Sequence, residues 1–339
     1  MIRAYVETSG ESPLLARAEA ASAAEALGGT PGRESLFAPD GLVAVELPDP
    51  EGARALAGRL ALAHRCLVLR AGPQEFEAAL AREGARGDRA AFRRIGRPSS
   101  GGADPAVLAA GRTYVASGGR IDLERPERRF WIASDREGAD HLLEEVAPVD
   151  RSSAARRRTS LLPFQRPVTL APRLARAAAN LARIRPGDRT VDPFLGTGAL
   201  LAEAGLLGGR ICGIDRDPEM VRGALRNLAH LGLTAESLVV GDAMDVEVGF
   251  DRPAEPFDAV LTDPPYGRAS STGGEPAERL VSRILPRWAD RVRTGGRVVV
   301  VQPEGAPPLP VPWEIRVAVS VRVHRSLTRE FRVYERAVR

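Results

Sequence analysis

Two short stretches decide the fold of this chain: residues 191–198, which read VDPFLGTG, and residues 263–266, which read DPPY. The first stretch ends an apolar run and leads through two glycines into a helix-like segment. The second follows another apolar run, residues 257–262. A strand that passes through a glycine turn into a helix is typical of a nucleotide-binding α/β unit. We therefore expect a mostly parallel sheet flanked by helices.

The sequence around these stretches alternates between strand-like and helix-like segments. Short apolar runs predict strands at residues 189–194, 210–214, 238–240, 257–262 and 297–302. We expect a helix at residues 172–182, another after the glycine turn, and a third behind a cap formed by Asp217 and Pro218. Residues 314–323 and 331–338 alternate as the strands of a hairpin do. This arrangement predicts a class I Rossmann-like methyltransferase domain with a mostly parallel, seven-stranded sheet.

Three expected strands end in residues suited to a nucleotide-like cofactor, because ligands of open α/β sheets bind at the carboxyl ends of the strands. The turn Gly196-Thr197-Gly198 presents backbone N–H groups at a helix N-terminus, where a carboxylate binds. Asp215 follows the second strand and suits two ribose hydroxyls, while Asp242 follows the third and suits an adenine amino group. Each signal is weak alone, since Asp215 also fits a helix cap and Asp242 a simple turn.

The fourth strand end, Asp263-Pro264-Pro265-Tyr266, decides between cofactors, because an NAD-binding domain shares only the earlier features. The two prolines stiffen the turn and direct the Asp263 carboxylate and the Pro264 carbonyl at one small donor. An aromatic amine has two N–H bonds, and accepting both aims its nitrogen lone pair at an electrophilic methyl group. Tyr266 is placed to stack on the base. The pattern predicts direct methyl transfer to an exocyclic amine of a base.

The motifs over residues 148–270 resemble the THUMP-domain tRNA guanine-N2 methyltransferases, in particular those that methylate guanine 10 of tRNA. The matching stretches are 150–152 (DRS), 172–176 (PRLAR), 192–198 (DPFLGTG), 213–218 (GIDRDP), 241–243 (GDA) and 263–268 (DPPYGR). The resemblance implies S-adenosylmethionine as the cofactor and tRNA as the substrate. It implies catalytic roles for Asp263, Pro264 and Tyr266. The implied cofactor-binding residues are Thr169, Asp192, Gly196, Thr197, Gly198, Asp215, Asp242 and Ala243.

The sequence departs from that family's pattern in two places. Leu195 and Ala199 stand where the family has Cys and Gly, although both glycines of the turn are kept. The loop at 164–170 lacks the family's glycine, while Thr169 keeps a hydroxyl there. The alternative substrates are guanine 6 of tRNA, a guanine N2 of rRNA, and adenine or cytosine of DNA. The sequence does not decide between one and two methyl groups.

The first half of the chain carries no catalytic motif. Strand-like runs at 42–47, 65–70 and 128–133 and helical runs at 14–27 and 73–85 predict small α+β units. Residues 120–132 resemble a strand region of a THUMP domain. We expect an N-terminal region with a THUMP-like RNA-binding domain at 1–150, a polar linker at 151–170 and the methyltransferase domain at 171–339.

The positive charge of the chain is carried by arginine, since the sequence contains no lysine. The formal net charge is +4, and seven arginines lie between Arg151 and Arg176 without one Asp or Glu. Coding bias explains the choice of arginine over lysine, but such a block also suits a phosphate backbone. We expect Arg156, Arg157 and Arg158 to contact tRNA phosphates without choosing the base.

The composition excludes several other classes of protein. With 339 residues, 44% of them hydrophobic, the chain needs no metal or disulfide to build a core. Cys66 and Cys212 lie far apart in apolar runs, which indicates buried side chains rather than a metal site or a nucleophile. No window approaches the roughly 18 apolar residues of a membrane span. We expect a cytoplasmic monomer without a metal or an obligate protein partner.

Overall fold

The computed structural model describes residues 1–32, 37, 41–96, 104–167, 169–245, 255–265, 277–289, 291–304, 308, 313–324 and 327–336. The chain forms two compact units. Unit 1 consists of Met1–Pro13, Leu27–Gly58 and Ala63–Val149, and unit 2 consists of Leu14–Ala26, Arg59–Leu62 and Asp150–Arg339. Unit 2 thus includes two short N-terminal segments that the sequence placed in the region 1–150.

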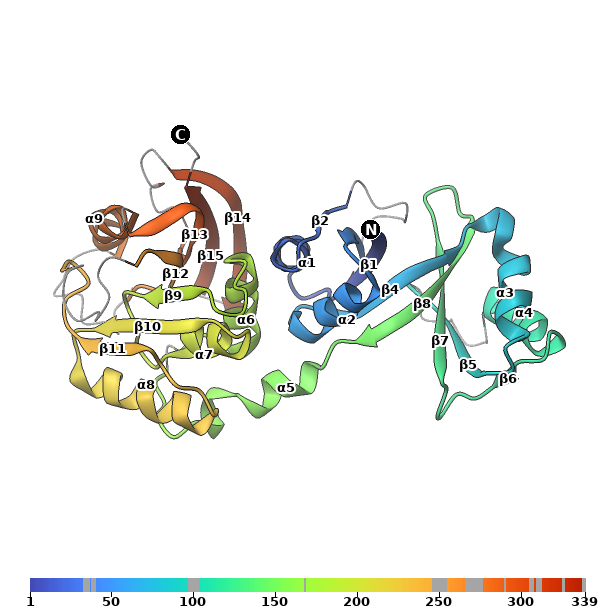
Figure 1. Cartoon of the computed structure of the whole chain (residues 1–339), viewed down its shortest axis with the longest axis horizontal. Coiled ribbons are helices and arrows are strands. Elements are labelled where there is room, and N and C mark those ends of the chain that lie inside the picture. Colours follow the sequence, from blue (N-terminus) through green and yellow to red (C-terminus); the bar gives the residue numbers. More distant parts are fainter. Residues whose placement is uncertain are drawn as a thin grey trace. The chain divides into compact units, whose positions relative to one another are not determined.

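Unit 1 is built on a sheet whose described strands have the order β2-β3-β1-β4-β8-β7-β5-β6 (Figure 1). The strands are β1 (Ile2–Thr8), β2 (Thr30–Pro31), β3 (Leu42–Leu47), β4 (Ala63–Ala71), β5 (Arg89–Arg94), β6 (Arg120–Ile121), β7 (Arg128–Ser134) and β8 (Asp140–Pro148). The helices are α2 (Pro50–Arg59), η1 (Pro73–Glu75), α3 (Phe76–Gly84) and α4 (Pro105–Ala116). The predicted strands at 42–47, 65–70 and 128–133 are confirmed. The sequence did not predict β1, β5 and β8, because Arg and Glu interrupt their apolar runs.

Unit 2 contains a sheet whose described strands have the order β11-β10-β9-β12-β13-β15-β14. The strands are β9 (Arg189–Asp192), β10 (Arg210–Asp215), β11 (Ser237–Val240), β12 (Phe257–Thr262), β13 (Val292–Pro303), β14 (Trp313–His324) and β15 (Leu327–Arg336). Neighbouring strands from β11 to β13 are parallel, whereas β15 is antiparallel to both β13 and β14. All the strands predicted for this half, and its C-terminal hairpin, are confirmed to within a few residues.

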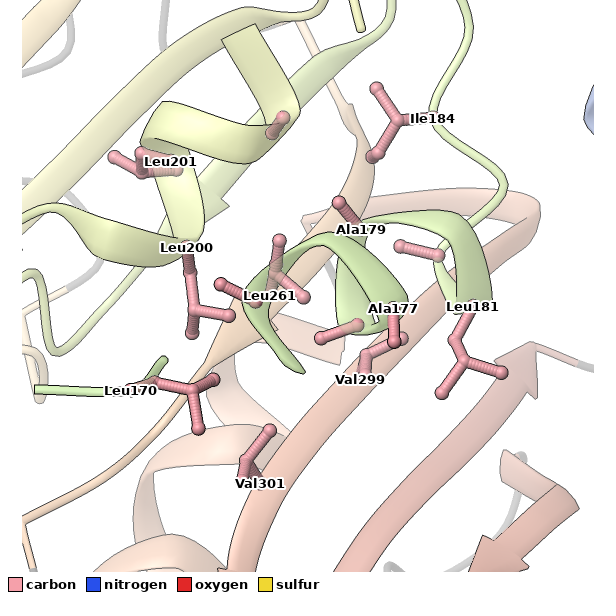
Figure 2. Close-up of a cluster of buried hydrophobic side chains, with 14 of the residues drawn as sticks. Leu170, Ala177, Ala179, Leu181, Ile184, Leu200, Leu201, Leu261, Val299 and Val301 are labelled. Atoms are coloured by element: carbon pink, nitrogen blue, oxygen red, sulfur yellow. The ribbon is translucent and has the colours of Figure 1, made fainter. Parts of the chain in front are cut away.

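Helices α6, α7 and α8 pack on one face of this sheet and α9 on the other. The helices of this half of the fold are α1 (Pro13–Ala26), α5 (Arg151–Arg156), η2 (Thr159–Leu161), α6 (Pro172–Leu181), α7 (Ala199–Leu206), α8 (Pro218–His230) and α9 (Ala277–Ala289). Apolar residues of α6, α7 and α8 share one cluster with β12 and β13, which includes Leu181, Leu201 and Val299 (Figure 2). On the other face, Trp288 and Leu285 of α9 pack against Val298 and other strand residues. The sequence did not predict α9, and α5 lies in the expected linker.

Local signals in the sequence explain where several helices begin. The Asp217 side chain caps α8 by accepting from the backbone N–H of Glu219 at 2.7 Å, with Pro218 as the first helical residue. The spacing of Val221, Leu225, Leu228 and Leu231 predicts one apolar face for α8, and this is partly wrong, because Leu225 is 47% exposed. The buried face instead contains Ala224 and Asn227, since neighbours on a helix surface recur at three or four positions.

The N-terminal helix α1 is held in unit 2 by buried polar contacts. Glu19 is fully buried, and its carboxylate accepts from the backbone N–H groups of Ala61 and Leu62 at 2.9 Å each. It also accepts from Nδ2 of Asn180 on α6 at 2.8 Å. Asn180 in turn accepts from Nε of Arg59 at 2.9 Å. Nothing in the local pattern of Leu14–Ala26 predicts this docking, because it depends on partners far along the chain.

No described helix of the chain combines the length and the apolar character that crossing a membrane requires.

Candidate active site

The carboxyl ends of four parallel strands meet at one edge of the unit 2 sheet. Backbone hydrogen bonds tie the loops together there: Leu195 N–H donates to Ile214 O at 2.8 Å, and Gly241 N–H donates to Asp215 O at 2.9 Å. The turns that follow β9, β10 and β11 therefore stand side by side. This is the edge at which an open α/β sheet binds its ligands.

The turn after β9 has a backbone conformation that requires glycine. Gly196 has φ +51° and Gly198 has φ +79°, and Gly198 is the residue directly before α7. A Cβ added at Gly198 would lie 3.1 Å from Cβ of Ala224 on α8. The two glycines thus allow both the left-handed turn and the close packing beneath it. The backbone N–H groups at the start of α7 suit an anionic group, as helix N-termini do.

Asp215 lies at the end of β10 and is bonded to the glycine turn. Its Oδ2 accepts from Gly196 N–H at 2.8 Å, and its Oδ1 accepts from Asp217 N–H at 3.0 Å. Burial raises the pKa of this carboxyl group, although the hydrogen bonds from Asp217 and Gly196 oppose the rise. A carboxylate has about four lone-pair positions, and Asp215 also accepts from the backbone of Arg216, so its carboxylate retains capacity for a further donor.

The loop before α6 joins the glycine turn through Thr169 and Asn227. The hydroxyls of Thr169 and Thr197 are 3.2 Å apart, which brings the predicted cofactor residue Thr169 to this edge. The buried Asn227 side chain accepts from Phe164 N–H at 2.9 Å and donates to Thr197 O at 3.0 Å. Sequence reasoning missed Asn227, and its only local signal was an amide on the apolar side of a helix.

Asp242 and Ala243 follow β11 at the same edge. Oδ1 of Asp242 accepts from Met244 N–H at 2.9 Å, which is the turn-forming contact. Oδ2 lies 3.3 Å from Nη2 of Arg216, and the Asp242 side chain is 43% exposed. Ala243 is buried, and its carbonyl accepts from Nε1 of Trp288 at 3.0 Å. The structure brings both residues to the edge, and their contact with an adenine ring stays a prediction.

Asp192 is a buried carboxyl group beneath this edge. Its Oδ1 accepts from Phe194 N–H at 2.9 Å and from the Thr262 hydroxyl at 2.8 Å. Burial, with smaller contributions from the charges of Asp263 and Asp215, raises the pKa of Asp192 to about 7. Asp192 is 2% exposed, so it supports the turns from below and links the end of β9 to the end of β12.

The Asp-Pro-Pro turn follows β12 directly. Oδ2 of Asp263 lies 3.2 Å from Nη1 of Arg329, a buried residue of β15. Pro264 is buried and Pro265 is half-buried. Tyr266, the residue predicted to stack on the base, lies outside the described residues. Sequence reasoning missed Arg329, because nothing near it in the chain indicates that it meets Asp263.

The three arginines expected to contact RNA differ in their surroundings. Nε and Nη2 of Arg157 donate to the two oxygens of Glu203 at 2.8 and 3.1 Å, and its side chain is 15% exposed. Arg156 is exposed and forms an ion pair at 3.0 Å with Asp150, whose side chain is exposed too. Arg158 is exposed as well. The pair with Glu203 gives Arg157 a structural role that the sequence did not predict, while its expected phosphate contact stays untested.

The described residues contain no group of three or more His, Cys, Asp or Glu side chains arranged to hold a metal ion. Cys66 and Cys212 are both buried. Burial raises the pKa of each thiol to about 12, which keeps both thiols protonated at neutral pH. Neither cysteine is suited to be a nucleophile.

A mostly parallel sheet with a glycine turn, consecutive strand-end carboxylates and an Asp-Pro-Pro turn defines a Rossmann-like methyltransferase. The family model for the UPF0020 (RMKL-like) methyltransferase domain matches residues 160–311. The crystal structure of TrmN from Thermus thermophilus is 24% identical, covers 99% of this chain and 100% of its own, and has a TM-score of 0.51. That likeness supports the fold of the chain.

Curated relatives narrow this class. The tRNA (guanine(10)-N2)-dimethyltransferase of Methanothermobacter thermautotrophicus is 37% identical over 225 residues, which are 65% of this chain and 65% of that protein. The probable tRNA (guanine(10)-N2)-dimethyltransferase of Methanothermococcus thermolithotrophicus is 31% identical over 48% of this chain and 98% of that sequence. This chain belongs to the tRNA guanine-N2 methyltransferase family.

Proposed function

We propose that this protein transfers methyl groups from S-adenosylmethionine to the N2 amine of a guanosine in tRNA, at position 10. The observation that carries the proposal is the Asp263-Pro264 turn, which stands at the end of β12 beside the strand ends with the glycine turn and Asp215. Two acceptors on one stiff turn suit a primary aromatic amine. The curated relatives are named as methyltransferases or dimethyltransferases of guanine 10 of tRNA, which supports guanine 10 as the target.

The residues at the strand ends fit S-adenosylmethionine. Gly196 and Gly198 leave room for the methionine part, whose carboxylate the N–H groups at the start of α7 attract. Asp215 stands at the end of β10, where its carboxylate would accept hydrogen bonds from the ribose hydroxyls. Thr169 and Thr197 place their hydroxyls beside the same turn. When bound, this cofactor supplies an electrophilic methyl group on a positively charged sulfur.

The chemistry asked of the protein is mainly positioning. The Asp263 carboxylate and the Pro264 carbonyl each accept one N–H of the amine, which turns the nitrogen lone pair out of conjugation with the ring. Held in this way, the nitrogen would be presented to the methyl group that the bound cofactor supplies. One proton of the methylated nitrogen is released to solvent. Holding the amine in a reactive orientation supplies a large part of the rate.

We also propose that unit 1 contains the THUMP-like RNA-binding domain and that Arg156 and Arg158 contact phosphates of the bound tRNA. Both arginines are exposed, and they belong to a stretch of the chain without acidic residues. Arg157 is left out of this proposal because Glu203 holds its guanidinium. Each phosphate contact releases condensed counterions, so binding is expected to weaken as salt concentration rises.

The function is tested by incubating tRNA with the protein and S-adenosylmethionine and measuring the modified nucleosides by mass spectrometry. The expected product is N2-methylguanosine, and N2,N2-dimethylguanosine if a second transfer follows. Asp263→Ala is expected to lower turnover below about one percent, while the dissociation constant of the cofactor changes less than tenfold. Methylated adenosine or cytidine as the product would refute the assigned base.

The RNA contacts are tested by the salt dependence of tRNA binding. The double variant Arg156→Ala/Arg158→Ala is expected to flatten the slope of log affinity against log salt by about 1.4 to 1.8, since each phosphate contributes roughly 0.7 to 0.9. A matched control is Arg54→Ala/Arg316→Ala, which removes two exposed arginines elsewhere. Equal slopes for both variants and the wild type would show that the RNA follows another path.

A further inference from the structure

Arg329 lies in β15 of the hairpin β14–β15 and contacts the Asp263-Pro264-Pro265 turn that follows β12. Its Nη1 lies 3.2 Å from Oδ2 of Asp263, and the two side chains are 6% and 17% exposed. Because both side chains are largely shielded from water, removing one of them would leave the charge of the other without a partner. We propose that Arg329 is a positioning residue for methyl transfer, which keeps the Asp263 carboxylate ionised and in one orientation towards the target amine. The proposal rests on the proposed function of the site.

The surrounding strands hold Arg329 in place. In β15, Arg329 is paired with Pro303 of β13 on one side and with Val321 of β14 on the other. β13 lies between β12 and β15 in the sheet, so the Arg329 side chain reaches past β13 to the turn after β12. A side chain whose backbone is fixed on both sides delivers its charge to one point. The hairpin thereby supplies a cation to a carboxylate 66 positions earlier in the chain.

The electrostatic setting shows why the carboxylate needs a cation. Asp192, Asp215 and Asp263 all lie at this edge, and the charges of the last two disfavour ionisation of Asp192. The same mutual repulsion acts on Asp263, whereas a neighbouring guanidinium favours its charged form. The charge state matters for the reaction because a protonated carboxyl group carries a donor and accepts less well. Arg329 therefore maintains the form of Asp263 that can accept an N–H of the amine.

An arginine is better suited to this task than a lysine. Whereas an ammonium group is a flexible point charge, the guanidinium is planar and presents its N–H donors in a fixed geometry that matches a carboxylate. It also leaves the carboxylate little freedom to rotate, since the hydrogen bond fixes Oδ2. Asp263 is thus an oriented acceptor, and the proton released after transfer passes to solvent.

The test compares Arg329→Met, which removes the charge at similar length, with Arg329→Lys, which keeps the charge. Arg332→Met is the matched control, because Arg332 lies on the same strand and pairs with Glu330 at 2.9 Å. The readouts are kcat for N2-methylguanosine formation as a function of pH, cofactor affinity by calorimetry, and the thermal midpoint of unfolding. Full-length protein and tRNA are used throughout.

We expect Arg329→Met to lower kcat by at least tenfold, to change cofactor affinity less than twofold, and to move the acid limb of the pH profile upwards. Arg329→Lys should keep the acid limb of the wild type and recover part of kcat, and Arg332→Met should leave both unchanged. A kcat of Arg329→Met within twofold of the wild type, with an unmoved acid limb, would overturn the proposal.

The experiment distinguishes a failure of the role proposed for Arg329 from a failure of the proposed function. If the wild type forms no N2-methylguanosine, the proposed function and this inference both fail. If Arg329→Met does not fold, Arg329→Lys decides: an acid limb shifted upwards despite the retained charge would overturn the role of Arg329, and an unshifted limb with reduced kcat supports it. Addition of guanidinium ion below denaturing concentration to Arg329→Ala should restore part of the activity.

Discussion

Replacing Glu19 by Ala tests whether α1 (Pro13–Ala26) is a structural part of the methyltransferase unit. Glu19 is fully buried and accepts three hydrogen bonds, two from the backbone of Ala61 and Leu62 and one from Asn180. The variant leaves both backbone N–H groups buried without an acceptor, at about 1–3 kcal/mol each. Asn180 keeps its second acceptor, the carbonyl of Arg59 at 2.9 Å. Burial raises the pKa of Glu19, so loss of its desolvated carboxyl group offsets part of the cost. We expect a net destabilisation of about 3 kcal/mol.

The assay is urea unfolding followed by tryptophan fluorescence in a Trp131→Phe background. Trp131 lies in unit 1, so the remaining signal comes from Trp288 and Trp313 of unit 2. Glu51→Ala is the control, because the Glu51 side chain is 79% exposed and its loss should change stability by less than about 0.5 kcal/mol. A loss below about 1 kcal/mol for Glu19→Ala would refute the reasoning, since it would mean that α1 does not need these contacts.

Three further predictions concern the site and its support. Asp215→Ala should raise the cofactor dissociation constant at least about 100-fold, because two hydrogen bonds from ribose hydroxyls to a charged acceptor contribute roughly 1.5–3 kcal/mol each. Calorimetry measures this dissociation constant. An equal loss of tRNA binding would mean that Asp215 has a structural role. Burial raises the pKa of Asp192 to about 7, so its contribution to stability is greatest below about pH 4 and falls until about pH 7. Asp192→Asn keeps the acceptor and should remove the part of that fall that lies between pH 5 and pH 8, about 2–3 kcal/mol, as measured by urea unfolding. Parallel pH dependences of the variant and the wild type would contradict this prediction. Arg157→Met should lower stability by about 1–3 kcal/mol without changing the salt slope of tRNA binding, and a flattened slope would return Arg157 to the RNA-contacting set.

Much of unit 2 could be predicted from short stretches of sequence, because the signals in those stretches are local. Gly196 and Gly198 mark a left-handed turn that a side chain disfavours, and Asp217 with Pro218 marks a helix start. Apolar runs of four to six residues located β9, β10 and β12. Each of these features depends on interactions within a few residues, so the pattern along the chain is sufficient to reveal it.

Among the elements that the sequence left out, α9, β5 and β8 depend on distant partners for their burial. The apolar face of α9 packs on β13 through Trp288, while Pro286 interrupts its helical pattern in the sequence. Arg94 of β5 and Glu144 of β8 interrupt the apolar pattern of these strands. The fold tolerates both charges because Arg94 forms an ion pair with Asp140 and Glu144 forms one with Arg128. Tertiary pairing therefore overrides the local pattern that a strand ordinarily shows.

The sequence by itself determined the order of the catalytic sheet's elements and the identity of the strand-end residues, including Asp215 and Asp263. Only the tertiary structure decided that Arg329 pairs with Asp263, that Glu203 pairs with Arg157, and that Leu14–Ala26 belongs to unit 2. The physical reason is that a local motif is stabilised by its own neighbours along the chain. A buried charge or amide is stabilised by whichever partner the fold brings within hydrogen-bonding distance, and that partner leaves no trace in the adjacent sequence.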